Sequence, residues 1–374
     1  MSNCYIIMKN DLVLIVHLTS ACNLRCTYCY GDHNFISELY DENIIIKSIK
    51  KCIDYCRHQL KIIFHGGEPL IIGVTKFEHI LREISEYAVA QSVKIAFSVQ
   101  TNLILLTSDY CELFKNYKVK IGTSLDGCDE YQNSSRVNIN GDSTFSTVLH
   151  KWLKLKDSCN YKDLCSGIIM TVTKKHIGKE SILLEFIKKH SLKCNIRPAF
   201  PICDEDTKSC MTPKEYATFF CNLFDLWFND ATFSTFDVAE FPRVITAILF
   251  KKTKLCSESQ NCGGHFLCSD ESGSFYSCNR LCGHRSFYLG NYTVDSIADI
   301  ICKNQEFSQN RYNLLSECHR CKWLSICNCG CPAVAFFSND NFNSKDYFCE
   351  ANKSIFEHVE NILKEYINNF SFES

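Results

Sequence analysis

The fold of this 374-residue chain is decided near its beginning, at residues 12–30, which read LVLIVHLTSACNLRCTYCY. The first part, Leu12–Leu18, is a continuous apolar run and predicts a strand buried on both faces, as in a parallel sheet. The second part places Cys22, Cys26 and Cys29 in the loop that follows the strand. In parallel barrels the loops after the strands carry the chemistry, so we expect a functional site here.

Around this stretch, residues 12–200 alternate short apolar runs with helical patterns. This alternation indicates an α/β fold with a parallel sheet. A closed eight-stranded barrel needs about 250 residues, so the sequence predicts a partial (β/α)6 barrel over residues 1–200. The predicted strands are Leu12–Leu18, Lys61–His65, Lys94–Thr101, Lys118–Ser124, Ser166–Thr173 and Cys194–Phe200. The predicted helices are Asp41–Arg57, Val74–Val89, Ser108–Asn116, Ser143–Lys156 and Ile177–His190.

The pattern changes after Phe200. Residues 201–255 are predicted to form a helical linker that contains a helix at Thr212–Asn229, with Thr212 as its N-cap. Residues 256–350 are dense in cysteine and glycine, with short strands and few long helices, which predicts a small domain organised by metal. Residues 351–374 are predicted to be a closing helix, Asn352–Ile367, and a tail.

The chain contains 26 cysteines. Residues 1–11 show no signal-peptide pattern, and the chain is long enough to bury a real core, so metal-bound or free thiols in the cytoplasm fit better than disulfides. The net charge of -2 predicts no nucleic-acid partner, and the apolar runs are too short to span a membrane.

Three thiolates, as in Cys22, Cys26 and Cys29, leave one iron of a [4Fe–4S] cluster open to a cofactor or substrate. A zinc knuckle or buried thiols are the alternatives. The spacing C-x3-C-x-aromatic-C, with Tyr28 as the aromatic residue, resembles the signature of the radical S-adenosylmethionine (SAM) enzymes. This resemblance implies that SAM binds the open iron and is cleaved to a 5'-deoxyadenosyl radical that abstracts hydrogen from a substrate.

The same resemblance implies a set of cofactor-binding residues. The HGGEP segment that begins at His65 resembles the family motif that holds the amino group of SAM, while other family segments would lie near its ribose and carboxylate. Tyr131-Gln132 stands where the family usually has His-Asp before the arginine. The implied cofactor residues are Tyr28, Gly66, Gly67, Glu68, Pro69, Ser124, Asp126 and Arg136.

A second cysteine array, preceded by Gly273, resembles the SPASM domain of radical enzymes that modify peptides and proteins. The resemblance implies two auxiliary [4Fe–4S] clusters, three clusters in all, although four thiolates also suit zinc. Cys282 and Cys329 are neighbours of these sets. The implied ligands are Cys262, Cys268, Cys278 and Cys331 for the first auxiliary cluster, and Cys318, Cys321, Cys327 and Cys349 for the second.

Two kinds of SPASM maturase compete. Anaerobic sulfatase-maturating enzymes oxidise a cysteine or serine to formylglycine and use an aspartate where this chain has Asn279. A neutral amide cannot accept that proton, which would leave the task to a residue such as Asp270 or Glu271. The sequence therefore favours maturation of a ribosomally made peptide (RiPP) through a thioether or carbon–carbon crosslink. Small-molecule dehydrogenation and a non-enzymatic iron–sulfur protein for electron transfer or regulation remain alternatives.

The expected partners follow from this interpretation. They are a peptide or protein substrate, possible help from a separate leader-recognition protein, and an electron donor such as flavodoxin or ferredoxin. We expect a leader peptide to need such a protein, or the enzyme body, because only residues 1–11 precede the first strand.

Overall fold

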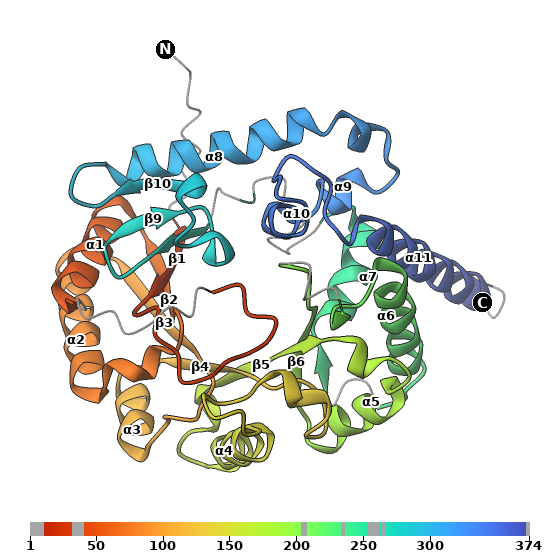
Figure 1. Cartoon of the computed structure of the whole chain (residues 1–374), viewed down its shortest axis with the longest axis horizontal. Coiled ribbons are helices and arrows are strands. Elements are labelled where there is room, and N and C mark those ends of the chain that lie inside the picture. The colour runs from red at the N-terminus through yellow and green to blue at the C-terminus, as the bar shows by residue number, and fades with distance from the viewer. Residues whose placement is uncertain are drawn as a thin grey trace. The chain divides into compact units, whose positions relative to one another are not determined.

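The computed structural model describes residues 11–31, 41–202, 208–232, 236–252, 262 and 266–371. The chain divides into two compact units (Figure 1). The first contains Met1–Ser124, Arg136–Ser166 and Asn261–Ser308, and the second contains Leu125–Ser135, Gly167–Gln260 and Gln309–Ser374.

The sheet of the first unit is built on four adjacent parallel strands, β1 to β4. On its other edge β1 pairs in parallel with β8, which continues into an antiparallel β8–β9–β10 ribbon. Strand β1 is therefore central in this unit, and its inward side chains Leu12, Leu14 and Val16 are buried. The strands are β1 (Asp11–His17), β2 (Gln59–His65), β3 (Lys94–Thr101), β4 (Lys120–Ser124), β8 (Phe266–Ser269), β9 (Ser274–Tyr276) and β10 (Tyr288–Asn291).

Helices α1 (Glu42–Tyr55), α2 (Val74–Ala90) and α3 (Ser108–Asn116) lie together on one side of these strands (Figure 1). Their apolar faces bury a cluster of aromatic rings in which Phe77 contacts both Phe64 and Phe114, with centroid distances of 5.0 and 5.2 Å. This packing is why the amphipathic periodicity of the sequence predicted these helices correctly. Helix α4 (Phe145–Asp157) also belongs to this unit.

The second unit contains most of β5 (Cys165–Val172), with β6 pairing in parallel to both β5 and β7. Helix α6 begins with a capping box, in which Thr212 accepts from the Glu215 amide and Glu215 accepts from the Thr212 amide. Helix α11 packs against α6. The other elements are β6 (Lys193–Pro198), β7 (Asp237–Val238), α5 (Glu180–Lys189), α6 (Pro213–Phe228), α7 (Glu240–Phe250), α9 (Leu324–Cys327), α10 (Pro332–Asn339) and α11 (Cys349–Ser371).

The predicted α/β class with a parallel sheet is confirmed, and each predicted strand and helix is found within a few residues of its expected bounds. The sequence did not single out one element. The cysteine-rich segment, for which few long periodic helices were predicted, contains one long helix, α8 (Ile297–Leu314). Its sequence, IADIICKNQEFSQNRYNL, has too little apolar periodicity to reveal a helix, because buried polar residues such as Asn304 and Arg311 occupy inward positions. The predicted boundaries at residues 200, 255 and 350 remain predictions.

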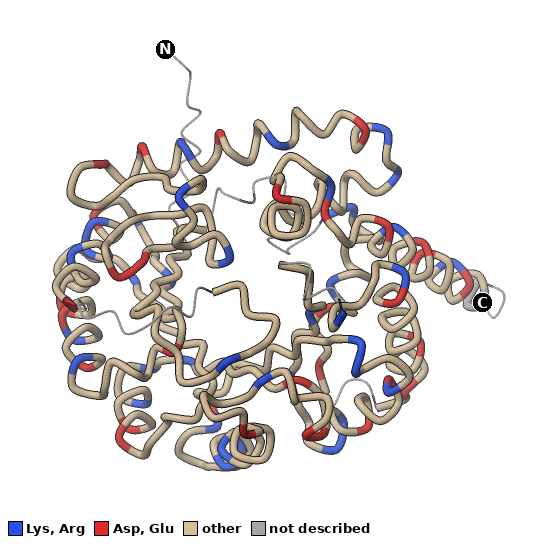
Figure 2. Tube along the Cα trace, in the orientation of Figure 1, with Lys and Arg blue, Asp and Glu red and all other residues tan. Residues whose placement is uncertain are grey.

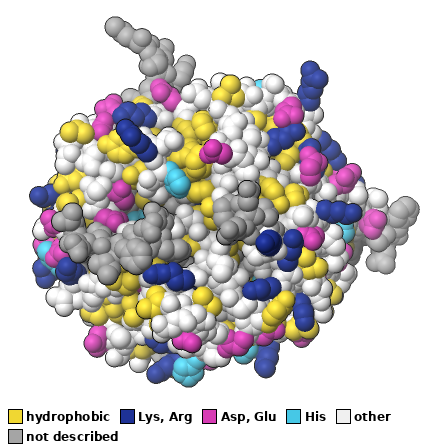
Figure 3. All heavy atoms as spheres, in the orientation of Figure 1, with side chains coloured by type: hydrophobic (Ala, Val, Ile, Leu, Met, Phe, Trp, Pro, Cys, Tyr) yellow, Lys and Arg dark blue, Asp and Glu magenta, His cyan; other side chains and the backbone are white. Residues whose placement is uncertain are grey.

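Charged residues of both signs alternate along the described helices, as Figure 2 shows for α2 and α11. On the face in Figure 3, hydrophobic side chains are interspersed with both kinds of charge. Among the described helices, none is both long and apolar enough to cross a membrane.

Candidate active site and metal centres

The loop after β1 is held in place by its own backbone and by Arg25. The guanidinium of Arg25 donates to the carbonyls of Cys22 and Leu24 at 2.8 and 2.7 Å. The amide of Leu24 points at the sulfur of Cys22 at 3.4 Å, and the Cys29 amide donates to the Cys26 carbonyl at 3.1 Å. The Leu24 amide aimed at sulfur suits a thiolate that is bound to metal, because a hydrogen bond to the sulfur stabilises its charge.

The HGGEP segment packs tightly against this loop. A Cβ on Gly66 would lie 2.3 Å from the Thr19 carbonyl oxygen, and one on Gly67 would lie 2.2 Å from that of Ala21. Gly66 also has a φ of +118°, which side-chain-bearing residues rarely adopt. The amides of Gly67 and Glu68 donate to the carbonyls of Thr19 and Ala21, both at 2.8 Å. Glycine is therefore required at both positions to bring β2 against the cysteine loop.

Glu68 is buried and ties this segment to the end of β3. Its carboxylate accepts from the Thr101 hydroxyl at 2.6 Å and from the amides of Asn102 and Leu70 at 2.8 and 3.1 Å. Burial raises the pKa of Glu68, and these hydrogen bonds and Arg136 oppose that rise. Asn102 in turn donates to Asn23 inside the cysteine loop at 2.7 Å. The carboxylate thus orients the loop in addition to its predicted contact with SAM.

The predicted arginine of the cofactor site also lies at the cysteine loop. Arg136 is buried and donates to the Tyr28 hydroxyl at 3.0 Å, so the structure brings these two predicted residues together. Ser124 ends β4 in the same unit and accepts from Gln100 at 3.1 Å. Asp126 belongs to the second unit, where its carboxylate accepts from the Thr171 amide at 2.9 Å.

Asn279 is the centre of a polar cluster. His17 Nε2 and Asn279 Oδ1 are 2.6 Å apart, and the amide nitrogen of Asn279 donates to the Tyr30 hydroxyl at 2.5 Å. The rings of His17 and His65 stack with centroids 5.6 Å apart. Burial and the neighbouring His17 lower the pKa of His65 to about 3, so His65 is neutral. The side chain at the expected base position is therefore a neutral amide, fixed on two sides.

Asp270 and Glu271 are the two acidic alternatives to Asn279 as the base. Both carboxylate oxygens of Asp270 accept hydrogen bonds within its own hairpin. One of its oxygens accepts from Ser272 and Ser274, and the other from the Tyr276 hydroxyl at 3.1 Å. Glu271 instead projects toward the cysteine loop, where it accepts from the Ser20 hydroxyl at 3.0 Å.

The first auxiliary set lies partly in the first unit. Cys268 is fully buried on β8, and Cys278 precedes the short 3₁₀ turn Asn279–Leu281. The hydroxyls of Ser269 and Ser277, each adjacent to one of these cysteines, are buried without a partner among the described residues. Hydroxyl donors of this kind suit a cluster sulfur as acceptor. Cys262 is half-buried between segments outside the described residues, and Cys331 belongs to the second unit.

Cys282 follows the same turn and lies beside Cys268 and His17. One ligand atom of each residue lies within 4.8 Å of the other two. The hydrogen bond with Cys268 and the nearby His17 outweigh burial and lower the pKa of Cys282. Burial alone would lower the pKa of His17, but Cys282, Asn279 and Glu271 raise it overall.

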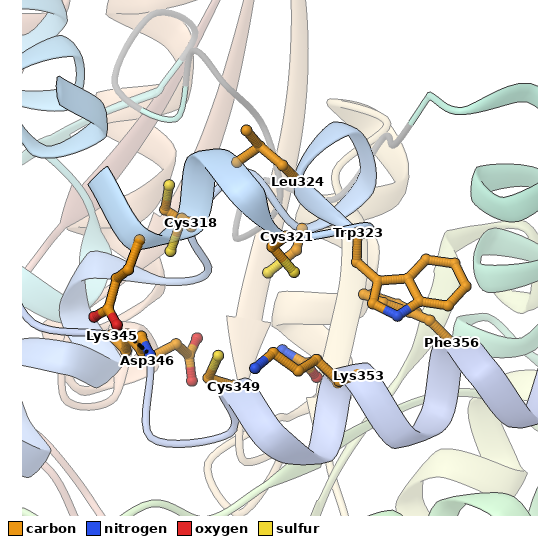
Figure 4. Close-up of a pocket in the computed structure, with 13 residues that line it drawn as sticks. Cys318, Cys321, Trp323, Leu324, Lys345, Asp346, Cys349, Lys353 and Phe356 are labelled. Carbon is orange, nitrogen blue, oxygen red and sulfur yellow. Dashed lines mark ion pairs between the residues drawn. The ribbon is translucent and has the colours of Figure 1, made fainter. Parts of the chain in front are cut away.

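The second auxiliary set surrounds a pocket in the second unit. Figure 4 shows Cys318 and Cys321, from the turn before α9, facing the same space as Cys349 at the start of α11. Cys327 and the neighbouring Cys329 also line it. All four predicted ligands of this cluster are thus brought together, with one further thiol.

Arg311 holds the cysteine loop of this pocket in shape. Its guanidinium donates to four backbone carbonyls, those of Cys329, Gly330, Phe342 and Ser344, at 2.7–3.3 Å. The Asp346 carboxylate accepts from the Cys331 amide at 2.7 Å. Asn328 and Cys329 both have positive φ, at +47° and +69°, so the loop needs this support.

The donor sets fit iron–sulfur clusters. Burial raises the pKa of Cys22 to about 11 and also raises that of Cys29 and Cys349, so these thiols are protonated unless a metal displaces the proton. An open three-cysteine loop in the first unit and a four-cysteine pocket in the second are the donor sets expected for one cluster with a free iron and one with full ligation.

Comparison with known proteins agrees with this geometry. The family description "Radical SAM superfamily" matches residues 16–177, which include the cysteine loop, the HGGEP segment and Arg136. The chain carries a radical SAM domain. A domain of this kind implies a [4Fe–4S] cluster and SAM, and it marks the chain as a radical SAM enzyme.

The curated relatives match the chain along nearly its whole length. A cysteine-type anaerobic sulfatase-maturating enzyme of Clostridium perfringens is 27% identical over 93% of this chain and 95% of its own. A serine-type enzyme of Bacteroides thetaiotaomicron is 24% identical over 93% and 89% of the two chains.

Solved structures share the fold. The structure titled "Native anSMEcpe with bound AdoMet and Cp18Cys peptide" has a TM-score of 0.83 and 24% identity, and covers 96% of this chain and 99% of that one. Streptococcus suis SuiB bound to S-adenosylmethionine has a TM-score of 0.59 and 15% identity, with coverage of 91% and 77%. The comparisons favour the sulfatase-maturase alternative over the crosslinking interpretation that the sequence favoured.

Sequence reasoning missed three contributors to these sites. His17 ends β1 and Tyr30 follows Cys29 directly, so their proximity to the predicted loop was a usable signal. Arg311 lies in the helix that was not predicted, and nothing in its local sequence distinguishes it from a surface arginine.

Proposed function

We propose that this radical SAM protein is a peptide or protein maturase of the sulfatase-maturating type, which oxidises a cysteine or serine side chain of a partner polypeptide to formylglycine. The observation that carries the proposal is end-to-end similarity to sulfatase-maturating enzymes, over 93% of this chain. The similarity extends through the segments that hold the predicted auxiliary cysteines.

Three [4Fe–4S] clusters and SAM are proposed as cofactors, with the eleven cysteine ligands implied by the sequence. When bound, they supply the 5'-deoxyadenosyl radical that removes a hydrogen atom from the substrate and an acceptor for the second electron. The chain's own residues orient these groups. Gly66 and Gly67 let the HGGEP backbone pack against the cysteine loop, where it would approach SAM, and Glu68 fixes that loop through Thr101 and Asn102. Arg136, hydrogen-bonded to Tyr28, would bind the carboxylate of SAM.

The oxidation also requires an acceptor for the substrate's thiol or hydroxyl proton. Asn279 cannot take it, and Asp270 is occupied by its hairpin. We therefore assign the proton to Glu271, whose carboxylate lies at the cysteine loop against Ser20. Loss of one hydrogen atom, one electron and this proton converts the cysteine side chain to a thioaldehyde, and water then releases hydrogen sulfide and leaves the aldehyde.

The test uses reconstituted full-length protein, SAM, a chemical reductant and a peptide with the motif Cys-x-Pro-x-Arg. Mass spectrometry should show loss of sulfur and gain of oxygen. The control is the triple variant in which Cys22, Cys26 and Cys29 are alanine, which should leave the peptide unchanged. An unmodified peptide with the wild-type protein, despite SAM cleavage, would contradict the proposal.

Crosslinking of a ribosomally made peptide is the second candidate, because Asn279 removes the carboxylate that the sulfatase reaction uses. The same mass spectra identify it by loss of two hydrogens within one peptide, with fragmentation suppressed between the joined residues. The proposed electron donor is a flavodoxin or ferredoxin in either case, and a leader-recognition protein would be needed only for crosslinking.

A further inference from the structure

Gln100 lies on the face of β3 that is opposite to helix α2. On the α2 side, the ring of Phe97 stacks on Phe64, which in turn contacts Phe77 of the helix, with centroid distances of 5.9 and 5.0 Å. Side chains alternate along a strand, so Gln100 points away from these rings. Gln100 is also next to last in β3, and the carboxyl ends of strands in parallel barrels carry the functional residues.

A glycine on the neighbouring strand makes room for this side chain. Gly122 of β4 pairs with Gln100, and a Cβ at position 122 would lie 2.5 Å from Gln100 Oε1. Gly122 does not have a positive φ, so glycine is needed there for space and not for backbone conformation. The carboxamide of Gln100 therefore lies over β4, where it donates to the Ser124 hydroxyl at 3.1 Å.

This hydrogen bond determines what the Ser124 hydroxyl can still do. A serine hydroxyl has one proton to donate and two lone pairs that accept. Because the Gln100 amide occupies one lone pair, the proton of Ser124 is directed elsewhere. Among the residues that the structure describes, Gln100 is the sole hydrogen-bond partner of the Ser124 side chain, so this proton is available to a ligand.

We propose that Gln100 is a positioning residue that makes the Ser124 hydroxyl a hydrogen-bond donor to SAM, and that Gly122 gives Gln100 the room to do so. The ribose and carboxylate oxygens of SAM are acceptors for such a donor. A hydroxyl whose orientation is already set loses less rotational freedom when a ligand binds, which strengthens the contact. The inference rests on the cofactor role of Ser124 in the proposed function, and it adds the two residues that prepare Ser124 for that role.

Isothermal titration of SAM into reconstituted full-length protein tests this role without substrate turnover. Ser124→Ala and Gln100→Ala should each raise the Kd for SAM by about five-fold, the usual effect of one neutral hydrogen bond. Their double variant should bind SAM no more weakly than Ser124→Ala alone, because Gln100 acts through Ser124. Gln100→Glu keeps the size but can only accept, so it should capture the Ser124 proton and weaken SAM binding as much as Gln100→Ala does.

Two further variants test the geometry. Gly122→Ala should weaken SAM binding by itself but add nothing to Gln100→Ala, because the added methyl group would displace the Gln100 carboxamide. Ser98→Ala is the matched control, since Ser98 lies on the same face of β3 and its hydroxyl donates to the Ile62 carbonyl instead. The control should bind SAM with wild-type affinity, and iron content, measured on every sample, should equal that of the wild type.

Wild-type SAM affinity in Ser124→Ala, Gln100→Ala or Gln100→Glu would overturn the proposal. Multiplied losses in the double variant of Gln100 and Ser124 would also overturn it, because Gln100 would then act independently of Ser124. An equal loss in Ser98→Ala would replace it with a general disturbance of the strand. The expected affinities without any formylglycine product would contradict only the proposed function.

Discussion

At the scale of single residues, Asn279 is a position at which the proposed formylglycine chemistry can be tested directly. Replacing it with aspartate would place a carboxylate between His17 and Tyr30, both of which can donate to it. Glu271 is the proposed base of the wild-type protein, so we expect Asn279→Asp to change wild-type formylglycine formation little. In Glu271→Gln the same substitution should raise it by about 100-fold, the usual contribution of a positioned general base. Single-turnover mass spectrometry measures it, with Asn291→Asp as a control in the same unit. An equal rate in Glu271→Gln with and without Asn279→Asp would show that a carboxylate at position 279 does not reach the substrate.

Glu271 should behave in the opposite way. Glu271→Gln keeps the size and the contact with Ser20 but removes the proton acceptor. We expect SAM cleavage to continue while formylglycine falls by at least 100-fold. Asp270→Asn, which alters the neighbouring hairpin carboxylate, is the control variant. If Glu271→Gln forms product at the wild-type rate, the assignment of Glu271 is wrong.

Gly66 offers a test of the cofactor loop. Gly66→Ala would drive a methyl group into the Thr19 carbonyl, whereas Gly141, also at positive φ, has no atom within 4 Å of the corresponding position. Gly141→Ala should cost about 1 kcal/mol of stability and leave SAM binding intact. Gly66→Ala should abolish SAM binding, measured by isothermal titration. Equal SAM affinity in the two variants would contradict the close approach seen here.

A buried histidine makes stability depend on pH. His176 is fully buried in the second unit, and burial lowers its pKa to about 4, below the unfolded value of 6.5. The unfolded chain therefore binds a proton between these pH values that the folded chain does not. The free energy of unfolding should fall by up to about 1.4 kcal/mol per pH unit as the pH drops from 6.5 to 4. Denaturant titrations of wild type and His176→Phe measure the difference in slope, and identical slopes would contradict it.

At the scale of elements, sequence patterns succeeded where burial is regular. Helices α1 to α6 bury one apolar stripe, and strands β1 to β6 bury one or both faces. Their apolar periodicity is therefore visible in the sequence. Helix α8 was missed because its inward positions include Asn304 and Arg311, whose polar groups bind backbone carbonyls. The cysteines that line the pocket of the second unit, and the contact of the HGGEP segment with the cysteine loop, were expected from the resemblance to radical SAM and SPASM motifs. The first auxiliary set stays a prediction. The contacts of His17 with Cys282 and Asn279 were not, since they join residues more than 260 positions apart.

Helix α8 carries a prediction of its own. Arg311→Met would keep much of the side-chain volume but leave the carbonyls of the Cys329 loop without a donor. We expect this variant to lose about four irons, those of the second auxiliary cluster, and to keep SAM cleavage. Arg320→Met, on the exposed turn nearby, should retain full iron content. Full iron content in Arg311→Met would show that the cysteines alone shape the pocket.

At the scale of the whole molecule, the chain passes between the two compact units at residues 124/125, 135/136, 166/167, 260/261 and 308/309. Strand β8, which pairs with the central strand β1, comes from residues 266–269. The second auxiliary set is complete only once Cys349 has been synthesised. At translation rates of about 5–20 residues per second, the ribosome needs roughly 10–50 s to reach β8 after β1 has emerged. During that interval the nascent polypeptide exposes unprotected thiols, and neither auxiliary centre has all its ligands. Loading of the proposed clusters would thus come late in the life of each molecule, after nearly the whole chain has been synthesised.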